Sequence, residues 1–114
     1  MPPSTEQNRF LRGILSLVLL LLLRKEDMYG YQLVQETKLL SGGRIQTQEG
    51  SLYPVLYKLQ ENGYISDRKE LVGKRMTRVY YHLEPAGEEH LRCLLAEYNA
   101  ISTGLHMLME ATEE

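Results

Sequence analysis

The sequence predicts a mainly α-helical domain with a small β-hairpin (α+β) and a long C-terminal helix. Three observations favour this fold class. Apolar residues recur at helical spacing over most of the chain, the period changes after Gly63 to one typical of strands, and a leucine seam of heptad spacing follows Pro85. With 114 residues, of which 43% are hydrophobic and 25% charged, the chain is expected to fold as one compact domain.

The first helix is predicted at residues 8–23. From Ile14 onward it is apolar on every side except at Ser16, so we expect several elements to sandwich it. Its apolar run follows two arginines, as in a secretion signal. However, no small-residue cleavage site follows, and the run is shorter than the roughly 20 residues that span a bilayer. No membrane association is therefore expected.

A second and a third helix are predicted in the next segment. The second begins behind Asp27, a candidate N-cap, and ends at a Ser-Gly-Gly stop signal. The third turns an apolar face to the core, made of Leu52, Val55, Leu56 and Leu59. Pro54 lies in the first turn of this helix if Ser51 is the N-cap. If the helix begins earlier, near Thr47 or Gln48, Pro54 removes one hydrogen bond and bends it.

A β-hairpin is predicted next, with strands at residues 64–71 and 76–83 joined by a basic turn that contains glycine. A long helix follows over residues 85–111, where Pro85 suits the first helical turn. Its apolar seam has alternating spacings of three and four residues, as in a coiled coil. The seam consists of Leu91, Leu94, Tyr98, Ile101, Leu105 and Leu108.

We expect this seam to be a dimerisation face. Because Gly104 weakens the helix by roughly 1 kcal/mol relative to alanine, the seam needs a second element to pack on, and the leucine-rich first helix is the candidate. The first helix would contribute Ile14, Leu17 and Leu21. The chain therefore divides into a module at residues 1–84, whose first helix also contributes to the interface, and a dimerisation helix at residues 85–114.

The order of the elements and the charge distribution point to nucleic acid. The chain has a net charge of −2, but residues 44–83 hold seven Lys or Arg against four Asp or Glu, a local net charge of +3. Three helices followed by a basic hairpin describe a winged helix-turn-helix, so residues 1–84 are predicted to be a DNA-binding domain. The third helix would lie in the major groove, and the hairpin tip would reach the adjacent backbone or minor groove.

Four segments are distinctive in combination: LRGILSLVLLLLL at residues 11–23, YGYQL at 29–33, GSLYPVLYKLQENGYI at 50–65 and YYHLEPAGEEHL at 80–91. Together they resemble the PadR family of bacterial transcriptional regulators over nearly the whole chain. With its single C-terminal helix, the chain is similar to the short branch of that family. The resemblance implies a homodimeric winged-helix repressor in which each first helix packs against the partner's long helix. The family's LTxxG pattern is LEPAG here, a departure at Glu84 that bears on the capping of the long helix.

The predicted DNA-binding residues lie around the entry of the third helix and on the hairpin. They are Gln46, Thr47, Gln48, Ser51, Tyr53, Lys58, Lys74, Arg75 and Arg78. Glutamine amides pair with adenine edges, and basic side chains contact phosphates, although helix capping and solubility are alternative uses of these groups. Tyr53 belongs to the GSLYP segment, which in the resemblance meets the groove, and its phenol would donate to a phosphate.

Tyr98 is the candidate effector-binding residue. In the resemblance, some family members bind planar aromatic compounds at the dimer centre, between aromatic residues of the long helix, and Tyr98 falls about where such a residue would lie. The chain has no tryptophan to strengthen such a stack. The expected partners are thus double-stranded DNA, a second copy of the chain and a small aromatic effector.

No metal, cofactor or enzymatic site is predicted. The single cysteine, Cys93, cannot form an intrachain disulfide, and with the three histidines it lacks the spacing of a zinc site. We expect Cys93 to be a small packing residue and the protein to be cytoplasmic. A nucleophile elbow, a phosphate-binding glycine loop and paired carboxylates are all missing from the sequence. The alternative to a DNA-binding regulator is a winged-helix protein-interaction module without DNA binding, with which the negative net charge is compatible.

Overall fold

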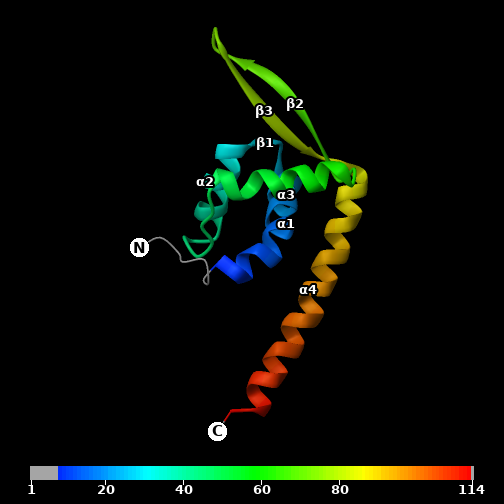
Figure 1. Ribbon diagram of the computed structural model, residues 1–114. Coiled ribbons are helices and arrows are strands. Elements are labelled where there is room, and N and C mark those ends of the chain that lie inside the picture. The colour runs from blue at the N-terminus through cyan, green and yellow to red at the C-terminus, as the bar shows by residue number, and fades with distance from the viewer. Residues whose placement is uncertain (1–7, 114) are drawn as a thin grey trace.

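The computed structural model of the protein describes residues 8–113, which form four helices and a three-stranded antiparallel sheet (Figure 1). In chain order the elements are α1 (Asn8–Lys25), β1 (Met28–Tyr29), α2 (Gly30–Leu40), α3 (Glu49–Glu61), β2 (Ile65–Val72), β3 (Met76–Leu83) and α4 (Pro85–Ala111). The predicted α+β fold class is thereby confirmed. The predicted helices and both strands of the hairpin are present within a few residues of their expected bounds.

The sheet contains a short strand that the sequence does not predict. Its order is β1-β3-β2, so the hairpin of β2 and β3 gains a two-residue strand from the segment that precedes α2. This strand pairs with β3 across Tyr29 and Tyr80. As a result, α2 begins at Gly30 with Tyr29 as its N-cap residue, and the prediction that Asp27 caps this helix is wrong.

Helix α1 lies at the centre of the core. It contacts α2, α3, α4 and β3, which confirms that several elements sandwich it (Figure 1). Its buried side chains are Leu15, Leu19, Leu20, Leu22 and Leu23. Each of the other six elements adds at least one buried side chain to the same cluster: Met28, Leu33, Leu52, Leu56, Leu59, Ile65, Tyr81 and Leu91. Burying one such leucine contributes about 1.5–3 kcal/mol, so the core rests mainly on α1 and α3.

A second stripe of α1 is only partly covered by the rest of the chain. Ile14, Leu17, Val18 and Leu21 are half-buried, whereas Leu15 on the other side of the helix is fully buried. The half-buried residues share one face of the helix because they are three or four residues apart. The described chain therefore leaves an apolar stripe along α1 that it does not itself cover.

Helix α4 leaves the body of the molecule after its first turns (Figure 1). Leu91 is fully buried against the core and Leu94 is half-buried, but Tyr98, Ile101 and Leu105 are exposed. The described molecule measures 63 × 36 × 21 Å with a radius of gyration of 16.2 Å. A compact chain of this length would have a radius of gyration of about 13 Å. The distal half of α4, from Tyr98 onward, therefore carries an apolar seam that has no partner within the described chain.

The junction between the hairpin and α4 is tightly packed. The backbone N–H of Glu84 donates to the carbonyl of Tyr64 at 3.0 Å. A Cβ atom on Gly87 would lie only 2.0 Å from the same carbonyl oxygen, so only glycine fits there. Glu84 is the N-cap residue of α4, but its side chain accepts a hydrogen bond from Ser66 Oγ at 2.6 Å instead of capping the helix. The start of α4 is thus joined to β2, which holds the hairpin and the helix in a defined relation.

Candidate nucleic-acid interface

Helix α3 exposes a polar face along its length. The helix begins at Glu49 after the N-cap residue Gln48, so the earlier of the two predicted starts is the observed one. Pro54 is consequently the sixth residue of the helix and lies beyond the first turn. Because proline has no N–H, the carbonyl of Gly50 lacks the usual helical partner. The predicted apolar face is buried at Leu52, Leu56 and Leu59 and half-buried at Val55.

The polar side chains around the start of α3 differ in their exposure to solvent. Gln46 and Gln48 are exposed, as is Ser51 inside the first turn. The side-chain amide of Gln46 donates to the carbonyl of Gly43 at 3.1 Å. In contrast, the hydroxyl oxygen of Thr47 is buried, and it has no hydrogen-bond partner within the described part of the chain. The structure thus presents Gln46, Gln48 and Ser51 to solvent and turns the hydroxyl of Thr47 inward.

Tyr53 joins the beginnings of α2 and α3. Its side chain is 47% exposed, and its hydroxyl donates a hydrogen bond to Glu49 Oε2 at 2.9 Å. This hydrogen bond, together with partial burial and the negative charge of Glu49, raises the pKa of Tyr53 above 10.0. Glu49 was not among the predicted site residues, although its i,i+4 spacing from Tyr53 was the signal that could have found it. Tyr57 and Lys58 lie farther along the helix and are both exposed.

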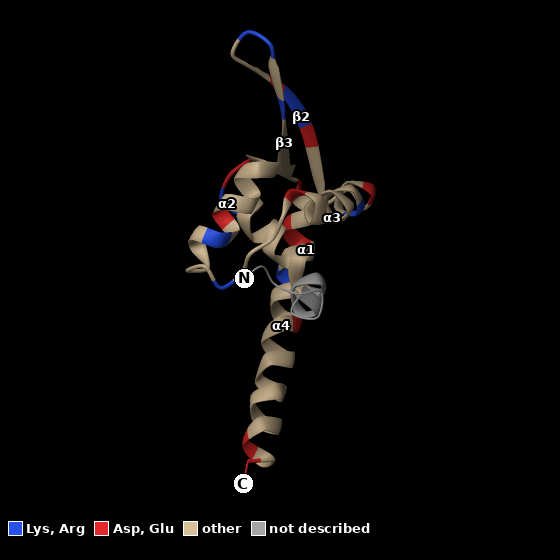
Figure 2. Cartoon of the chain, turned by 60° about the vertical axis from the view of Figure 1, so that its left-hand side comes forward, with Lys and Arg blue, Asp and Glu red and all other residues tan. Residues whose placement is uncertain are grey.

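The hairpin of β2 and β3, called the wing below, ends in a basic turn. Gly73 has a φ of 70°, which favours glycine, and Lys74 and Arg75 next to it are exposed. In Figure 2 the turn at the far end of the wing has the colour of Lys and Arg. Arg78 lies nearer the base, where its guanidinium stacks over the ring of Tyr29 at 4.3 Å. Two of the three predicted wing cations are therefore at the tip, and the third is held against the sheet.

The outer face of the sheet carries a charged network that the sequence does not reveal. The carboxylate of Asp27 accepts hydrogen bonds from the guanidinium of Arg68 and from Nδ1 of His82, the latter at 2.7 Å. Partial burial acts to raise the pKa of Asp27, but these two partners outweigh it, so that the pKa lies below the ordinary 3.8. Arg68 also donates to Glu70 Oε1 at 3.1 Å and lies over the ring of Tyr80 at 5.2 Å.

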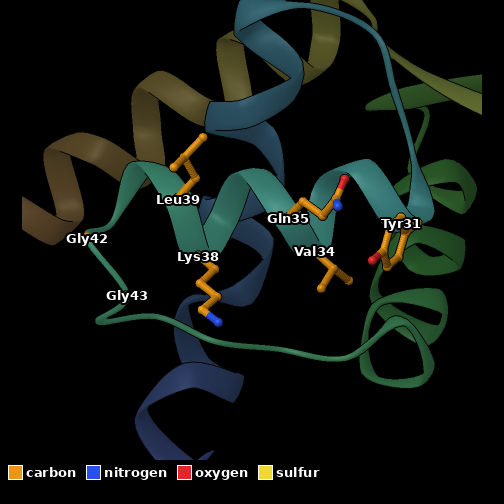
Figure 3. A pocket seen from close by; sticks show the side chains of 7 residues that line it. All are labelled: Tyr31, Val34, Gln35, Lys38, Leu39, Gly42 and Gly43. Carbon is orange, nitrogen blue, oxygen red and sulfur yellow. The ribbon is translucent and has the colours of Figure 1, made fainter.

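A hollow lies between α2 and the loop that follows it (Figure 3). Its volume is about 580 Å³, and its lining residues are Tyr31, Val34, Gln35, Lys38, Leu39, Gly42 and Gly43. Val34 and Lys38 point toward the loop that carries Gly42 and Gly43 (Figure 3). Lys38 is the one charged side chain in this lining, so the hollow offers no pair of acid and base groups for catalysis.

Metal and membrane sites are also missing from the described part of the chain. In residues 8–113 no group of three or more His, Cys, Asp or Glu side chains could hold a metal ion. No helix in that range is long and apolar enough to cross a membrane.

Cys93 is exposed, so the expectation that it packs inside this chain is wrong. The predicted effector residue Tyr98 is exposed on the free part of α4. Its neighbours among the predicted site residues are those of the seam on the same helix.

Comparisons with known proteins agree with this geometry. The family model described as "Transcriptional regulator PadR-like family" matches residues 18–93. A crystal structure of a PadR family transcriptional regulator from Eggerthella lenta is 31% identical, with a TM-score of 0.75 over 89% of this chain and 87% of that chain. The crystal structure of Bacillus subtilis PadR in complex with operator DNA is 29% identical, with a TM-score of 0.67 over 72% of this chain and 46% of that chain. The same protein, the negative transcriptional regulator PadR, matches at 28% identity over 88 residues, which is 77% of this chain and 48% of the regulator.

Proposed function

The chain belongs to the PadR-like family of transcriptional regulators, and from this membership we propose that it binds operator DNA as a homodimeric repressor. The observation that carries the proposal is the polar outer face of α3, which is followed directly by a wing with cations at its tip. A related protein, Bacillus subtilis PadR, has been solved in complex with operator DNA, which supports a similar use of this surface. The regulators it resembles are not named as enzymes, and the hollow beside α2 holds no catalytic groups.

Helix α3 enters the major groove in this proposal. Gln46, Gln48 and Ser51 lie at its N-terminal end, where short polar side chains reach base edges and phosphates. Thr47 takes part through its backbone, because its hydroxyl is turned inward. Tyr53 donates its hydroxyl hydrogen to Glu49, so its hydroxyl oxygen is left to accept a hydrogen bond in the groove. Lys58 contacts a phosphate farther along the groove.

The wing supplies contacts to the DNA backbone. Lys74 and Arg75 at its tip neutralise phosphates beside the groove that α3 occupies, and Arg78 supports them from the base. Residues 1–84 thus act as the DNA-binding domain. Because these contacts are electrostatic, they raise the affinity for all duplexes alike and leave sequence discrimination to α3.

The dimer forms when α4 of each copy packs on α1 of the other. Residues 85–114 act as the dimerisation helix. The distal seam of α4 packs against the half-buried apolar stripe on α1 of the second copy. The two surfaces consist of Ile14, Leu17 and Leu21 on α1 and of Leu94, Tyr98, Ile101, Leu105 and Leu108 on α4, with Leu91 at the buried end of the seam. Two α3 helices related by a two-fold axis would read half-sites about 10 bp apart.

Repression and its release complete the proposal. Bacillus subtilis PadR is a negative transcriptional regulator, which supports repression by this chain, and we propose that this takes place in the cytoplasm. Tyr98 of each copy would face the dimer centre, where a small aromatic effector could stack on it. An effector that binds there changes the relation between the two α4 helices and therefore the separation of the two α3 helices.

Binding to duplex DNA at several salt concentrations tests the proposal. We expect that replacing both Lys74 and Arg75 by alanine weakens binding to all duplexes and lowers the slope of log affinity against log salt by about two. Arg92→Ala on α4 is the matched control, because it removes an exposed cation away from the wing. Equal salt slopes for the wild type and the wing variant would contradict the assignment of the wing. Failure of the wild type to bind any duplex at low salt would favour the protein-interaction module.

A further inference from the structure

The wing meets the helical body through its base, where β3 contacts α1 and β1, and β2 contacts α3. Its two strands pair with each other along their full eight residues, but only the two residues of β1 extend the sheet on the other side. Just before β1, Asp27 contacts both strands of the wing at once. One carboxylate oxygen of Asp27 accepts from Arg68 on β2, and the other accepts from His82 on β3.

These three residues share the outer face of the sheet because of the strand register. Arg68 lies opposite Tyr80, and His82 lies two pairs farther toward the base of the wing, on the same face. The ring of Tyr80 meets that of Tyr29 edge to face with centroids 5.4 Å apart, and the guanidinium of Arg68 lies over the Tyr80 ring at 5.2 Å. In addition to the pairing of β1 with β3, the carboxylate therefore joins the segment entering α2 to both strands of the wing.

We propose that Asp27 is a positioning residue for the wing, which sets the direction of the wing relative to α2 and α3 and thereby the affinity for DNA. The proposal rests on the proposed function, since it concerns how the wing meets the duplex. The side chains of Asp27, Arg68 and His82 are 29%, 45% and 51% exposed. Ion pairs this exposed contribute little to the stability of the fold, so the proposed effect of Asp27 is a modest one on the direction of the wing.

The sign of the expected effect separates this role from simple electrostatics. A carboxylate repels phosphates, so removing one near a DNA-binding surface ordinarily strengthens binding. Removing the charge of Asp27 should instead weaken binding, because the direction of the wing becomes less fixed and its tip meets the backbone less often.

The test compares Asp27→Asn with Asp67→Asn in titrations of duplex DNA. Asp67 lies on β2 next to Arg68, but its side chain points to the opposite face of the sheet, so its variant removes the same charge without touching the network. We expect Asp27→Asn to weaken binding about fivefold and Asp67→Asn to leave it unchanged or slightly stronger. Unchanged or tighter binding by Asp27→Asn would overturn the proposal. Asp27→Glu, which restores the charge, should recover part of the affinity, and no recovery would count against a role for the carboxylate.

A thermodynamic cycle shows whether Asp27 acts through the wing. In a background with Lys74 and Arg75 replaced by alanine, Asp27→Asn should have no further effect on DNA affinity. Additive losses would mean that Asp27 acts elsewhere and would refute the proposal. Thermal unfolding of each variant checks that the protein remains folded.

Hydrogen exchange separates this proposal from the proposed function. The amides of β2 and β3 should exchange faster in Asp27→Asn than in Asp67→Asn, whether or not DNA is bound. Equal exchange in the two variants would overturn the role of Asp27. If the wing loosens as expected but the wild type binds no duplex, Asp27 still positions the wing, and it is the DNA-binding function that fails.

Discussion

The hydroxyl of Tyr53 lies 2.9 Å from Glu49 Oε2 and only 3.0 Å from the place that a Cβ atom would occupy on Gly30. Gly30 belongs to the YGY segment and Tyr53 to the GSLYP segment. The two segments are about 20 residues apart in the sequence, and the close approach leaves little room for a side chain on residue 30 beside Tyr53. The contact fixes the first turn of α2 against the first half of α3.

The hydrogen bond between Tyr53 and Glu49 predicts a change in a tyrosine pKa. Glu49→Gln removes the negative charge that opposes ionisation of the phenol, so the pKa of Tyr53 should fall back toward 10.0. Titration of the tyrosine ring carbon by NMR measures this, with Tyr53→Phe used to assign the signal. An unchanged pKa for Tyr53 would show that Glu49 does not hold the hydroxyl in solution.

The two sides of α4 should differ in their effect on association. Ile101 and Met107 are exposed to a similar degree, 57% and 65%, but Ile101 lies on the seam and Met107 on the opposite side of the helix. Ile101→Glu would place a charge in an apolar interface and should raise the dimer dissociation constant more than tenfold. Met107→Glu should leave it nearly unchanged. Sedimentation over a range of protein concentrations decides the point, and equal behaviour of the two variants would argue against the seam as the interface.

Two glycines on helices should respond in opposite ways to alanine. Gly87→Ala drives a methyl group into the carbonyl of Tyr64 and the side chain of Leu83, and should lower the free energy of unfolding by about 3 kcal/mol. Gly50→Ala adds a methyl group that meets nothing within 4 Å in α3, and should raise this free energy by up to about 1 kcal/mol. Chemical denaturation measures both changes at one protein concentration. A tolerated Gly87→Ala would mean that the junction of the wing and α4 is looser than described.

Acid should remove the contribution of Asp27 to stability. Its pKa is below 3.8 in the folded protein and near 3.8 in the unfolded chain, so its stabilisation is fully present above pH 3.8 and is lost as the pH falls through the folded pKa. At pH 6, Asp27→Asn should be less stable than the wild type by at most about 1 kcal/mol. The difference should shrink below pH 3.8. If the difference in free energy of unfolding between the wild type and Asp27→Asn stays constant down to pH 2, the ionised carboxylate does not stabilise the protein.

The elements with long, regular patterns could be predicted from the sequence. The hairpin was expected at residues 64–71 and 76–83 and is found at Ile65–Val72 and Met76–Leu83. The long helix was expected at residues 85–111 and is found there. In both cases the apolar pattern extends over many residues and ends at turn or capping residues. Interactions between residues close in the sequence are therefore enough to predict these elements.

Features that depend on distant parts of the chain could not be predicted. β1 is two residues long and exists because β3 offers it a free edge, so it leaves no periodic signal. Aspartate is a residue type that commonly caps helices, but the carboxylate of Asp27 is instead bonded to Arg68 and His82 of the wing. These partners follow it by 41 and 55 residues in the sequence. The exposure of Cys93 likewise depends on where α4 leaves the core.

The free half of α4 also bears on how the protein would respond to its own abundance. In water, a single copy leaves Tyr98, Ile101, Leu105 and Leu108 exposed, and the proposed association with a second copy would bury them. By mass action, the number of paired copies at low abundance then rises with the square of the total. Occupation of a promoter would consequently switch over a narrow range of synthesis rates, and a modest drop in supply would relieve it.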